Sequence, residues 1–204
     1  MLAGLAVPSG AARPGPAPAR TAEAGAQAPT PAARRMADWA VARDDTRGRP
    51  FVVVDKLAAR VFAFDRNGIL VGATPALLGL ARGDDIVPGI GALPLAEIGP
   101  AQRITPAGRY EAHLGANLAG HRILWVDYDA AVSLHPVVTN NPAEHRLQRL
   151  ATASILDNRI SYGCINVPAR FYARVIQPLF TPAGGIVYIL PETRPMDALL
   201  RTPG

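Results

Sequence analysis

A succession of short apolar segments separated by glycine- and proline-rich turns begins at Pro50, and it restricts the chain to a β-rich fold. Residues 51–55 and 61–64 are strand candidates because they are dominated by valine and phenylalanine. The Asp-Arg-Asn-Gly sequence at 65–68 predicts a hairpin turn, after which residues 69–72 form a third strand. The sequence therefore predicts that the domain opens with a β-meander.

The remainder of the chain continues this pattern and adds two short helices. Further strands are predicted at 109–114, 122–128, 131–135 and 185–190. Helical spacing over 142–151 predicts one helix, and Pro168 begins a second that ends at Pro178. Residues 74–108 are rich in glycine and proline, include Arg82-Gly-Asp-Asp85 and predict a long functional loop. We expect a mainly β fold with two or three short helices.

Composition divides the chain into four parts. Residues 1–35 contain six prolines and no aromatic residue. Such a segment cannot bury enough apolar surface to offset its ordering entropy, so it is predicted to be a disordered tail or the remnant of a signal segment. Residues 36–49 are predicted to form a short helix and linker, 50–193 one folded domain, and 194–204 a C-terminal tail.

The charge and hydropathy of the chain exclude two classes of partner. Its net charge is +5, of which residues 1–35 carry +3 and residues 36–204 carry +2. No basic stripe interleaved with aromatic residues is present, so nucleic-acid binding is not expected. No apolar run approaches the roughly 18 residues that a membrane-spanning helix needs, so no integral membrane span is expected.

Cys164 is the only cysteine among 204 residues, so it cannot form an intramolecular disulfide. Two interpretations remain, a small packed hydrophobe or a reactive nucleophile. Gly163 allows close backbone approach, and the amides of Gly163 and Cys164 would face an oxyanion in the second interpretation. Ser161 and Tyr162 place hydroxyl groups beside the sulfur. These neighbours favour reactivity.

A reactive thiol requires a base, and the chain has four histidines. His135 closes the predicted strand 131–135, where a strand end holds an imidazole rigidly at the rim of a cleft. His145 lies in a charged helix and is expected to be solvated, and His113 and His121 are expected on a surface hairpin. One cysteine and scattered histidines do not have metal-ligand spacing, so no metal or cofactor is predicted.

A serine nucleophile is the competing enzymatic interpretation. Ser161 or Ser133 would be paired with a histidine, but the chain has no Gly-x-Ser-x-Gly elbow. A phosphate-binding loop is not predicted either, because Gly89-Ile-Gly91 lacks the third glycine, strand and helix that such loops require.

Four ordered motifs are similar to those of a known family. Ser161-Tyr-Gly-Cys-Ile-Asn166 resembles the Ser-His-Gly-Cys-x-Arg/Asn signature of the L,D-transpeptidase catalytic domain, also called the YkuD domain. Residues 52–69 resemble its opening hairpins, Thr105–Tyr110 its Thr-Pro-x-Gly-x-Phe/Tyr turn, and Leu134-His135 its Ile-His-Gly. The resemblance covers about residues 50–190. It implies that residues 50–193 form an L,D-transpeptidase-like catalytic domain with a β-rich sandwich fold.

The resemblance implies a cysteine L,D-transpeptidase that acts on peptidoglycan stem peptides through a thioester, with Cys164 as nucleophile and His135 as general base. The other implied assignments are oxyanion and loop support from Ser161, Tyr162 and Gly163, and substrate binding by Arg159 and Asn166, with Asn166 also bracing the loop. Two alternatives stay open, an L,D-carboxypeptidase or hydrolase using the same thiol, and a non-catalytic domain that binds the cell wall. Because peptidoglycan lies outside the inner membrane, a periplasmic or cell-envelope location is implied.

Two residues depart from the family pattern. Tyr162 stands where the family has a second histidine, and tyrosine does not carry a proton near pH 7 as imidazole does. Pro136 stands where the family has glycine, which stiffens the backbone and removes an N–H. Residues 139–158 are an insertion that is predicted to lie over the cleft as a lid. The sequence does not fix the oligomeric state or the acyl acceptor.

Overall fold

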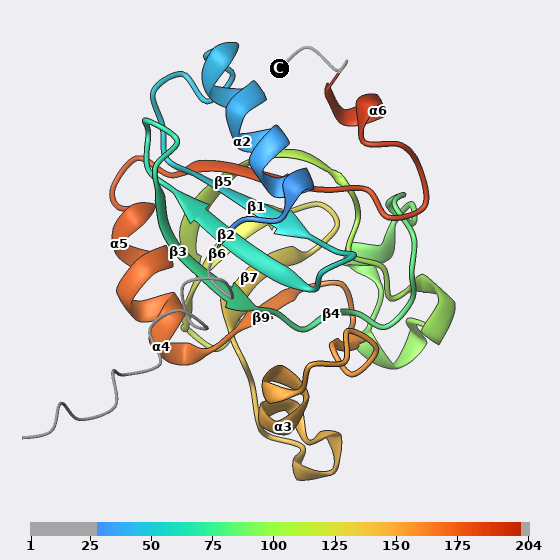
Figure 1. Cartoon of the computed structure of the whole chain (residues 1–204). Coiled ribbons are helices and arrows are strands. Elements are labelled where there is room, and N and C mark those ends of the chain that lie inside the picture. Colours follow the sequence, from blue (N-terminus) through green and yellow to red (C-terminus); the bar gives the residue numbers. More distant parts are fainter. Residues whose placement is uncertain (1–27, 201–204) are drawn as a thin grey trace, which may run out of the picture.

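The computed structural model describes residues 28–200, and its architecture is mostly β (Figure 1). One sheet of eight strands has the order β3-β2-β1-β10-β5-β6-β7-β9, and β4 and β8 form a separate pair. The strands are β1 (Phe51–Asp55), β2 (Arg60–Phe64), β3 (Leu70–Pro75), β4 (Leu78–Gly79), β5 (Gly108–Ala116), β6 (Arg122–Asp127), β7 (Val132–Pro136), β8 (Arg159–Ser161), β9 (Ile165–Val167) and β10 (Gly185–Ile189). The expectation of a mainly β fold with few short helices is confirmed, and the main sheet is continuous through β5 and nearly closed.

The helices are short and lie around this sheet (Figure 1). They are α2 (Pro31–Ala42), α3 (Arg146–Ala151), α4 (Ala169–Phe171), the π-helical turn η5 (Tyr172–Ile176), α5 (Gln177–Leu179) and α6 (Asp197–Leu200). Single 3₁₀ turns are η1 (Ile90–Ala92), η2 (Leu95–Glu97), η3 (Pro100–Gln102) and η4 (Pro142–Glu144). No helix within residues 28–200 has the length and apolar character needed to cross a membrane.

The opening meander forms as predicted. The Asp65 carboxylate accepts hydrogen bonds from the backbone N–H groups of Asn67 and Ile69, at 2.8 and 2.9 Å. Gly68 follows with a φ of +77°, a left-handed conformation that glycine adopts without steric cost. This turn joins β2 to β3 in antiparallel register.

The first described helix begins earlier than expected. Residues 31–35 belong to α2, so the predicted disordered tail is wrong for these residues, while residues 1–27 lie outside the described part of the chain. Thr30 caps the helix by accepting a hydrogen bond from the N–H of Ala33 at 3.1 Å, and Pro31 occupies the first helical position. The Thr30 hydroxyl also donates to Asp55 at 2.6 Å, which attaches the start of α2 to the end of β1.

Two hydrophobic clusters occupy opposite faces of the sheet. The larger cluster includes Val52, Val54, Leu124, Leu134 and Ile165, and the helical run from α4 to α5 packs against it. The smaller cluster is covered by α2, and its members include Met36, Phe51, Phe62, Phe64 and Tyr188. Because both faces of β1 are buried, its sequence is a continuous apolar run and not an alternating one.

Three local expectations differ from the structure. The helical run does not end at Pro178, because α5 contains this proline and continues to Leu179. The preceding π-helical turn changes the pattern of backbone hydrogen bonds at the point where proline has no N–H to donate. The helix expected over 142–151 is divided into η4 and α3 at His145, which has a left-handed φ of +49°. The strands β8 and β9, on either side of Cys164, were not predicted, because each has only three residues.

Candidate active site

The parallel pairing of β7 with β9 brings Cys164 and His135 together. His135 is opposite Asn166 in the ladder and Leu134 is opposite Ile165. Cys164 directly precedes β9, so the register places it beside Ser133. Successive side chains alternate between the faces of a strand, so Ser133 and His135 share one face with Cys164 and Asn166. The neighbouring Leu134 and Ile165 are fully buried in the core and fix this arrangement.

The contacts within this group of four confirm the shared face. The Ser133 hydroxyl donates to the Cys164 sulfur at 3.5 Å. The amide nitrogen of Asn166 lies 3.4 Å from His135 Nε2 and donates to the Cys164 carbonyl at 3.3 Å. The Cys164 side chain is half-buried, so the sulfur is within reach of a ligand.

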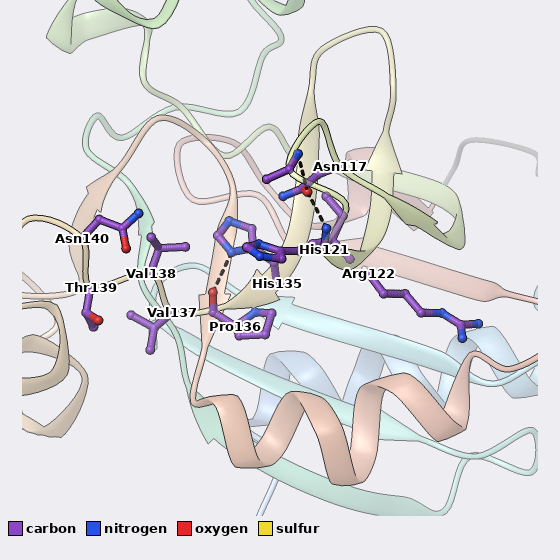
Figure 2. A pocket seen from close by; sticks show the side chains of 11 residues that line it. Asn117, His121, Arg122, His135, Pro136, Val137, Val138, Thr139 and Asn140 are labelled. Carbon is purple, nitrogen blue, oxygen red and sulfur yellow. Dashed lines mark hydrogen bonds between the residues drawn. The ribbon is translucent and has the colours of Figure 1, made fainter.

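A backbone carbonyl sets the orientation of the His135 ring. Nδ1 lies 2.7 Å from the carbonyl oxygen of Pro136 (Figure 2). A carbonyl can only accept, so Nδ1 carries the hydrogen and Nε2 of the neutral ring is left with a lone pair. The Asn166 amide, which can donate to that lone pair, is on the Nε2 side. Proline at position 136 retains the carbonyl that this contact requires.

Electrostatics favour the charged forms of the thiol and the imidazole. Burial alone raises the pKa of Cys164, but the hydrogen bond and positive charge of His135, with a further hydrogen bond from Ser133, lower it below the ordinary value of 9.0. Burial alone lowers the pKa of His135, but the hydrogen bond and negative charge of Cys164 and the hydrogen bond to Pro136 raise it above 6.5. The opposite shifts favour a thiolate–imidazolium pair.

The loop before Cys164 is closed by hydrogen bonds of its own. The Ser161 hydroxyl donates to the carbonyl of Cys164 at 2.6 Å and accepts from the N–H of Gly163 at 3.1 Å. The Gly163 N–H is therefore engaged inside the loop and does not face a free position, contrary to its expected part in an oxyanion site. The Cys164 N–H has no acceptor among the described residues, so it is the one of the two amides left for an oxyanion.

Gly163 also fits a position that admits no side chain. Its φ is +133°, and a Cβ added there would lie 2.7 Å from the carbonyl oxygen of Ile104. The next residue, Thr105, donates to the Gly163 carbonyl at 2.8 Å and accepts from the N–H of Gly79 at 2.8 Å. The Thr-Pro-x-Gly turn thus supports the loop that carries the nucleophile.

The two expected substrate-binding residues are engaged within the protein. Arg159 binds the Glu192 carboxylate through both terminal nitrogens, at 2.6 and 3.1 Å, and donates to the Lys56 carbonyl at 2.9 Å. The side-chain oxygen of Asn166 accepts from Arg146 of α3 at 2.7 Å. The structure therefore places Asn166 in the group around His135 and places Arg159 in a separate ion-pair network.

A cavity of about 490 Å³ adjoins His135. Figure 2 shows the His135 ring between Asn117 and His121 of the β5–β6 turn and Val138 to Asn140 after β7, with the Arg122 guanidinium pointing away. Residues 139 and 140 of the insertion thus line the cavity beside the base, while α3 extends away from the sheet (Figure 1). The exposed positions of His113, His121 and His145 agree with their expected surface placement.

Sequence reasoning missed three contributors to the site. Ser133 was considered only as a nucleophile, and its apolar neighbours Val132 and Leu134 do not indicate a contact with sulfur. Arg103 lies over the ring of Tyr162, with its Cζ 3.9 Å from the ring centroid, and Arg146 binds Asn166. The alternation of strand 131–135 could have placed Ser133 beside His135, but no local signal indicated either arginine. Within residues 28–200, no group of three His, Cys, Asp or Glu side chains could hold a metal ion.

The site is therefore an imidazole on β7 and a thiol directly before the neighbouring parallel strand β9. Among solved structures, the chain is similar to the catalytic domain of the L,D-transpeptidase from E. faecium, with 17% identity over 70% of this chain and 98% of that chain, and a TM-score of 0.38. It is also similar to an L,D-transpeptidase from Mycobacterium smegmatis, with 15% identity, coverage of 69% and 58%, and a TM-score of 0.38. A third is the helical cell shape determining protein Pgp2 from Campylobacter jejuni, with 14% identity, coverage of 74% and 52%, and a TM-score of 0.43.

The chain spans a little more than half the length of the last two proteins. No family model matches the sequence, and no curated protein matches it. At these identities and TM-scores, the likeness to the three solved structures carries no conclusion about chemistry.

Proposed function

We propose that the protein is a cysteine L,D-transpeptidase that acts on peptidoglycan stem peptides. The observation that carries this proposal is the paired site, in which His135 Nδ1 is held by the Pro136 carbonyl while the pKa of Cys164 is lowered by His135. A buried structural cysteine requires neither contact. The four sequence motifs that resemble the L,D-transpeptidase domain support the choice of substrate.

In the proposed first step, the Cys164 thiolate attacks the carbonyl that links the diamino-acid residue to the terminal D-Ala. The N–H of Cys164 stabilises the oxyanion, and one such donor typically contributes a rate factor of about 10²–10³. The imidazolium of His135 gives its proton to the amine of D-Ala, the C–N bond breaks, and a thioester with Cys164 remains.

In the second step, the amine of another stem peptide attacks the thioester. Neutral His135 accepts the proton from this amine, a new amide forms, and the Cys164 thiolate leaves. The same base therefore serves the expelled and the attacking amine. The proposed location is the periplasm or cell envelope, where the substrate lies.

The alternative with water as acceptor would use the same residues and give an L,D-carboxypeptidase. The cavity beside His135 can admit either a water molecule or an amine, so the two activities are distinguished by their products. Purified muropeptides incubated with the protein and read by mass spectrometry are expected to yield cross-linked dimers. Trimmed monomers without dimers would assign hydrolysis instead.

Covalent labelling distinguishes the proposed enzyme from a non-catalytic domain that binds the cell wall. A carbapenem is expected to acylate the wild-type thiol and to leave Cys164→Ala unmodified, as measured by intact-protein mass. His145→Asn is the matched control, because His145 is an exposed histidine outside the site. An unmodified wild-type protein that also yields no muropeptide product would remove the support for catalysis.

A further inference from the structure

The guanidinium of Arg103 is held in place by two contacts that do not use its terminal nitrogens. Its Cζ lies 3.9 Å from the centroid of the Tyr162 ring, and its Nε donates to the Ile98 carbonyl at 3.1 Å. Within residues 28–200, neither terminal nitrogen has a hydrogen-bond acceptor and no carboxylate lies within ion-pair distance. Arg103 is half-buried, and neither terminal nitrogen is fully enclosed by the protein. A stacked guanidinium keeps its edge free for bidentate binding.

The other arginines near the nucleophile loop are already committed. Arg159 forms its ion pair with Glu192, and Arg146 binds Glu144 and Asn166. Each of these two guanidinium groups therefore already has a carboxylate partner. Among the described arginines that contact this loop or Asn166, Arg103 is therefore the one with donors available for an incoming anion.

The position of Arg103 is coupled to the nucleophile through the backbone. Its carbonyl accepts from the N–H of Ala81 at 3.0 Å, which holds the chain on one side. The two residues that follow it contact Gly163, through the close approach of the Ile104 carbonyl and the hydrogen bond from Thr105. On the other side, Tyr162 is two residues from Cys164, so their Cα atoms are at most about 7 Å apart.

We propose that Arg103, supported by Tyr162, binds the free C-terminal carboxylate of the residue that the enzyme expels. This inference rests on the proposed function. The bond that breaks is the last peptide bond of the stem peptide, so the terminal carboxylate lies only about one residue, or ~4 Å, beyond the reacting carbonyl. Tyr162 then serves as the aromatic face under the guanidinium and has no need to carry a proton, which gives a reason for tyrosine where the family has histidine.

The test measures binding, which does not require turnover. The Cys164→Ala protein is titrated calorimetrically with a stem tetrapeptide that ends in D-Ala and with the same peptide that ends in D-alaninamide. Adding Arg103→Gln is expected to weaken binding of the free acid about 10- to 100-fold, the usual loss for a charge-assisted hydrogen bond. Binding of the amide should not change, and Arg103→Lys should retain part of the preference for the acid. Arg66→Gln, an exposed arginine in the β2–β3 turn, is the matched control and should bind as the parent does.

Equal affinity for acid and amide in the parent, no binding of either peptide, or an acid affinity that Arg103→Gln leaves unchanged would overturn the inference. A second measurement, alkylation of Cys164 by iodoacetamide in the otherwise wild-type protein, is expected to proceed at the wild-type rate in Arg103→Gln. A parallel loss of alkylation would assign Arg103 to the structure of the loop and would also overturn the inference. If the preference for the acid depends on Arg103 but no transpeptidation or hydrolysis occurs, the proposed function fails while this subsite stands.

Discussion

At the scale of single residues, the His135 ring is oriented by the main chain. The contact from Nδ1 to the Pro136 carbonyl takes the place of a third side chain, and it is independent of the side chain at position 136. Proline at position 136 removes a backbone N–H, but this contact uses the carbonyl and is therefore unaffected. Ser161 likewise forms two contacts with the main chain. Its hydroxyl closes the nucleophile loop by accepting from the N–H of Gly163 and donating to the carbonyl of Cys164.

The first prediction concerns the reactivity of Cys164. Because His135 is the main group that offsets the effect of burial, His135→Asn should raise the pKa of the thiol. The pH dependence of alkylation by iodoacetamide measures this directly: the wild-type midpoint is expected below 9.0, and the variant midpoint at higher pH. His145→Asn should leave the midpoint in place. A midpoint that stays unchanged in His135→Asn would show that the imidazole does not act on the sulfur.

The second prediction concerns Gly163. Gly163→Ala introduces a Cβ against the Ile104 carbonyl and an unfavourable φ, and is expected to lower the free energy of unfolding by about 1–3 kcal/mol and to slow alkylation of Cys164. Gly120→Ala is the control, because Gly120 also has a positive φ but no atom within 4 Å of the added Cβ. Urea unfolding and alkylation rates provide both readouts. Equal losses in the two variants would rule out a special role of the close contact.

At the scale of elements, a buried ion-pair network ties together segments far apart in the sequence. Lys56 follows β1, and its ammonium binds the Asp84 carboxylate at 2.8 Å and lies 3.6 Å from Glu192, all three side chains being almost fully buried. Asp84 also accepts from the backbone N–H groups of Glu192 and Thr193, both at 2.8 Å. Glu192 in turn holds Arg159 at the start of β8. The network therefore fixes the strand that leads to the nucleophile loop.

The third prediction tests this network. Asp84→Asn leaves the buried Lys56 ammonium without its closest counter-charge and is expected to lower the free energy of unfolding at pH 7 by about 3–5 kcal/mol, measured by urea denaturation. Asp85→Asn removes an exposed carboxylate and should cost about 1 kcal/mol or less. A loss in Asp84→Asn no larger than that in Asp85→Asn would contradict the structural role of the network.

The pH dependence of stability follows from the same carboxylate. Burial raises the pKa of Asp84, but hydrogen bonds from Lys56, Thr193 and the backbone outweigh burial and lower it below the ordinary value of 3.8. A lowered folded-state pKa contributes stability that is present above the unfolded-state value and is lost as the pH falls toward the folded-state value. The difference in unfolding free energy between wild type and Asp84→Asn should therefore shrink below about pH 4. A difference that stays constant to pH 2.5 would oppose this assignment.

The sequence predicts an element when the residues that determine it lie close together in the chain. Apolar runs and the 65–68 turn placed β1 to β3, and a strand end placed His135, because these signals lie within a few residues. The three-residue strands β8 and β9 and the ion pair of Arg159 with Glu192 depend on partners 31 residues or more away in the chain. Asp84 lay inside a segment that composition marked only as a loop, and nothing near it indicated a buried carboxylate.

At the scale of the whole molecule, α2 completes the fold by covering one face of the sheet (Figure 1). Four of its residues, Ala33, Met36, Ala37 and Ala40, are almost fully buried in the smaller cluster. Residues 31–35 of this helix were predicted to be disordered from their composition, because alanine side chains are small and give only a weak hydrophobic pattern. Against the aromatic side chains of this sheet face, the same small side chains allow the helix to approach closely.

The fourth prediction concerns this packing. Met36 is fully buried in the cluster with Phe51 and Tyr188, so Met36→Ala is expected to lower the free energy of unfolding by about 2–5 kcal/mol. Val41→Ala, on a side chain that is 43% exposed, should cost about 0.5 kcal/mol or less. Thermal or urea unfolding measures both. Equal small losses would mean that α2 does not contribute to the stability of the domain.

The parallel pairing of β7 with β9 has a consequence for how the molecule can be divided. Parallel neighbours need a crossover, and here residues 137–158 leave the sheet after the base and return before the nucleophile. A break in the exposed backbone at Thr152–Ala153 would leave His135 on one fragment and Cys164 on the other, with every strand intact. Neither fragment alone would have an activated thiol, so alkylation of Cys164 at neutral pH would report the reassembly of the two halves.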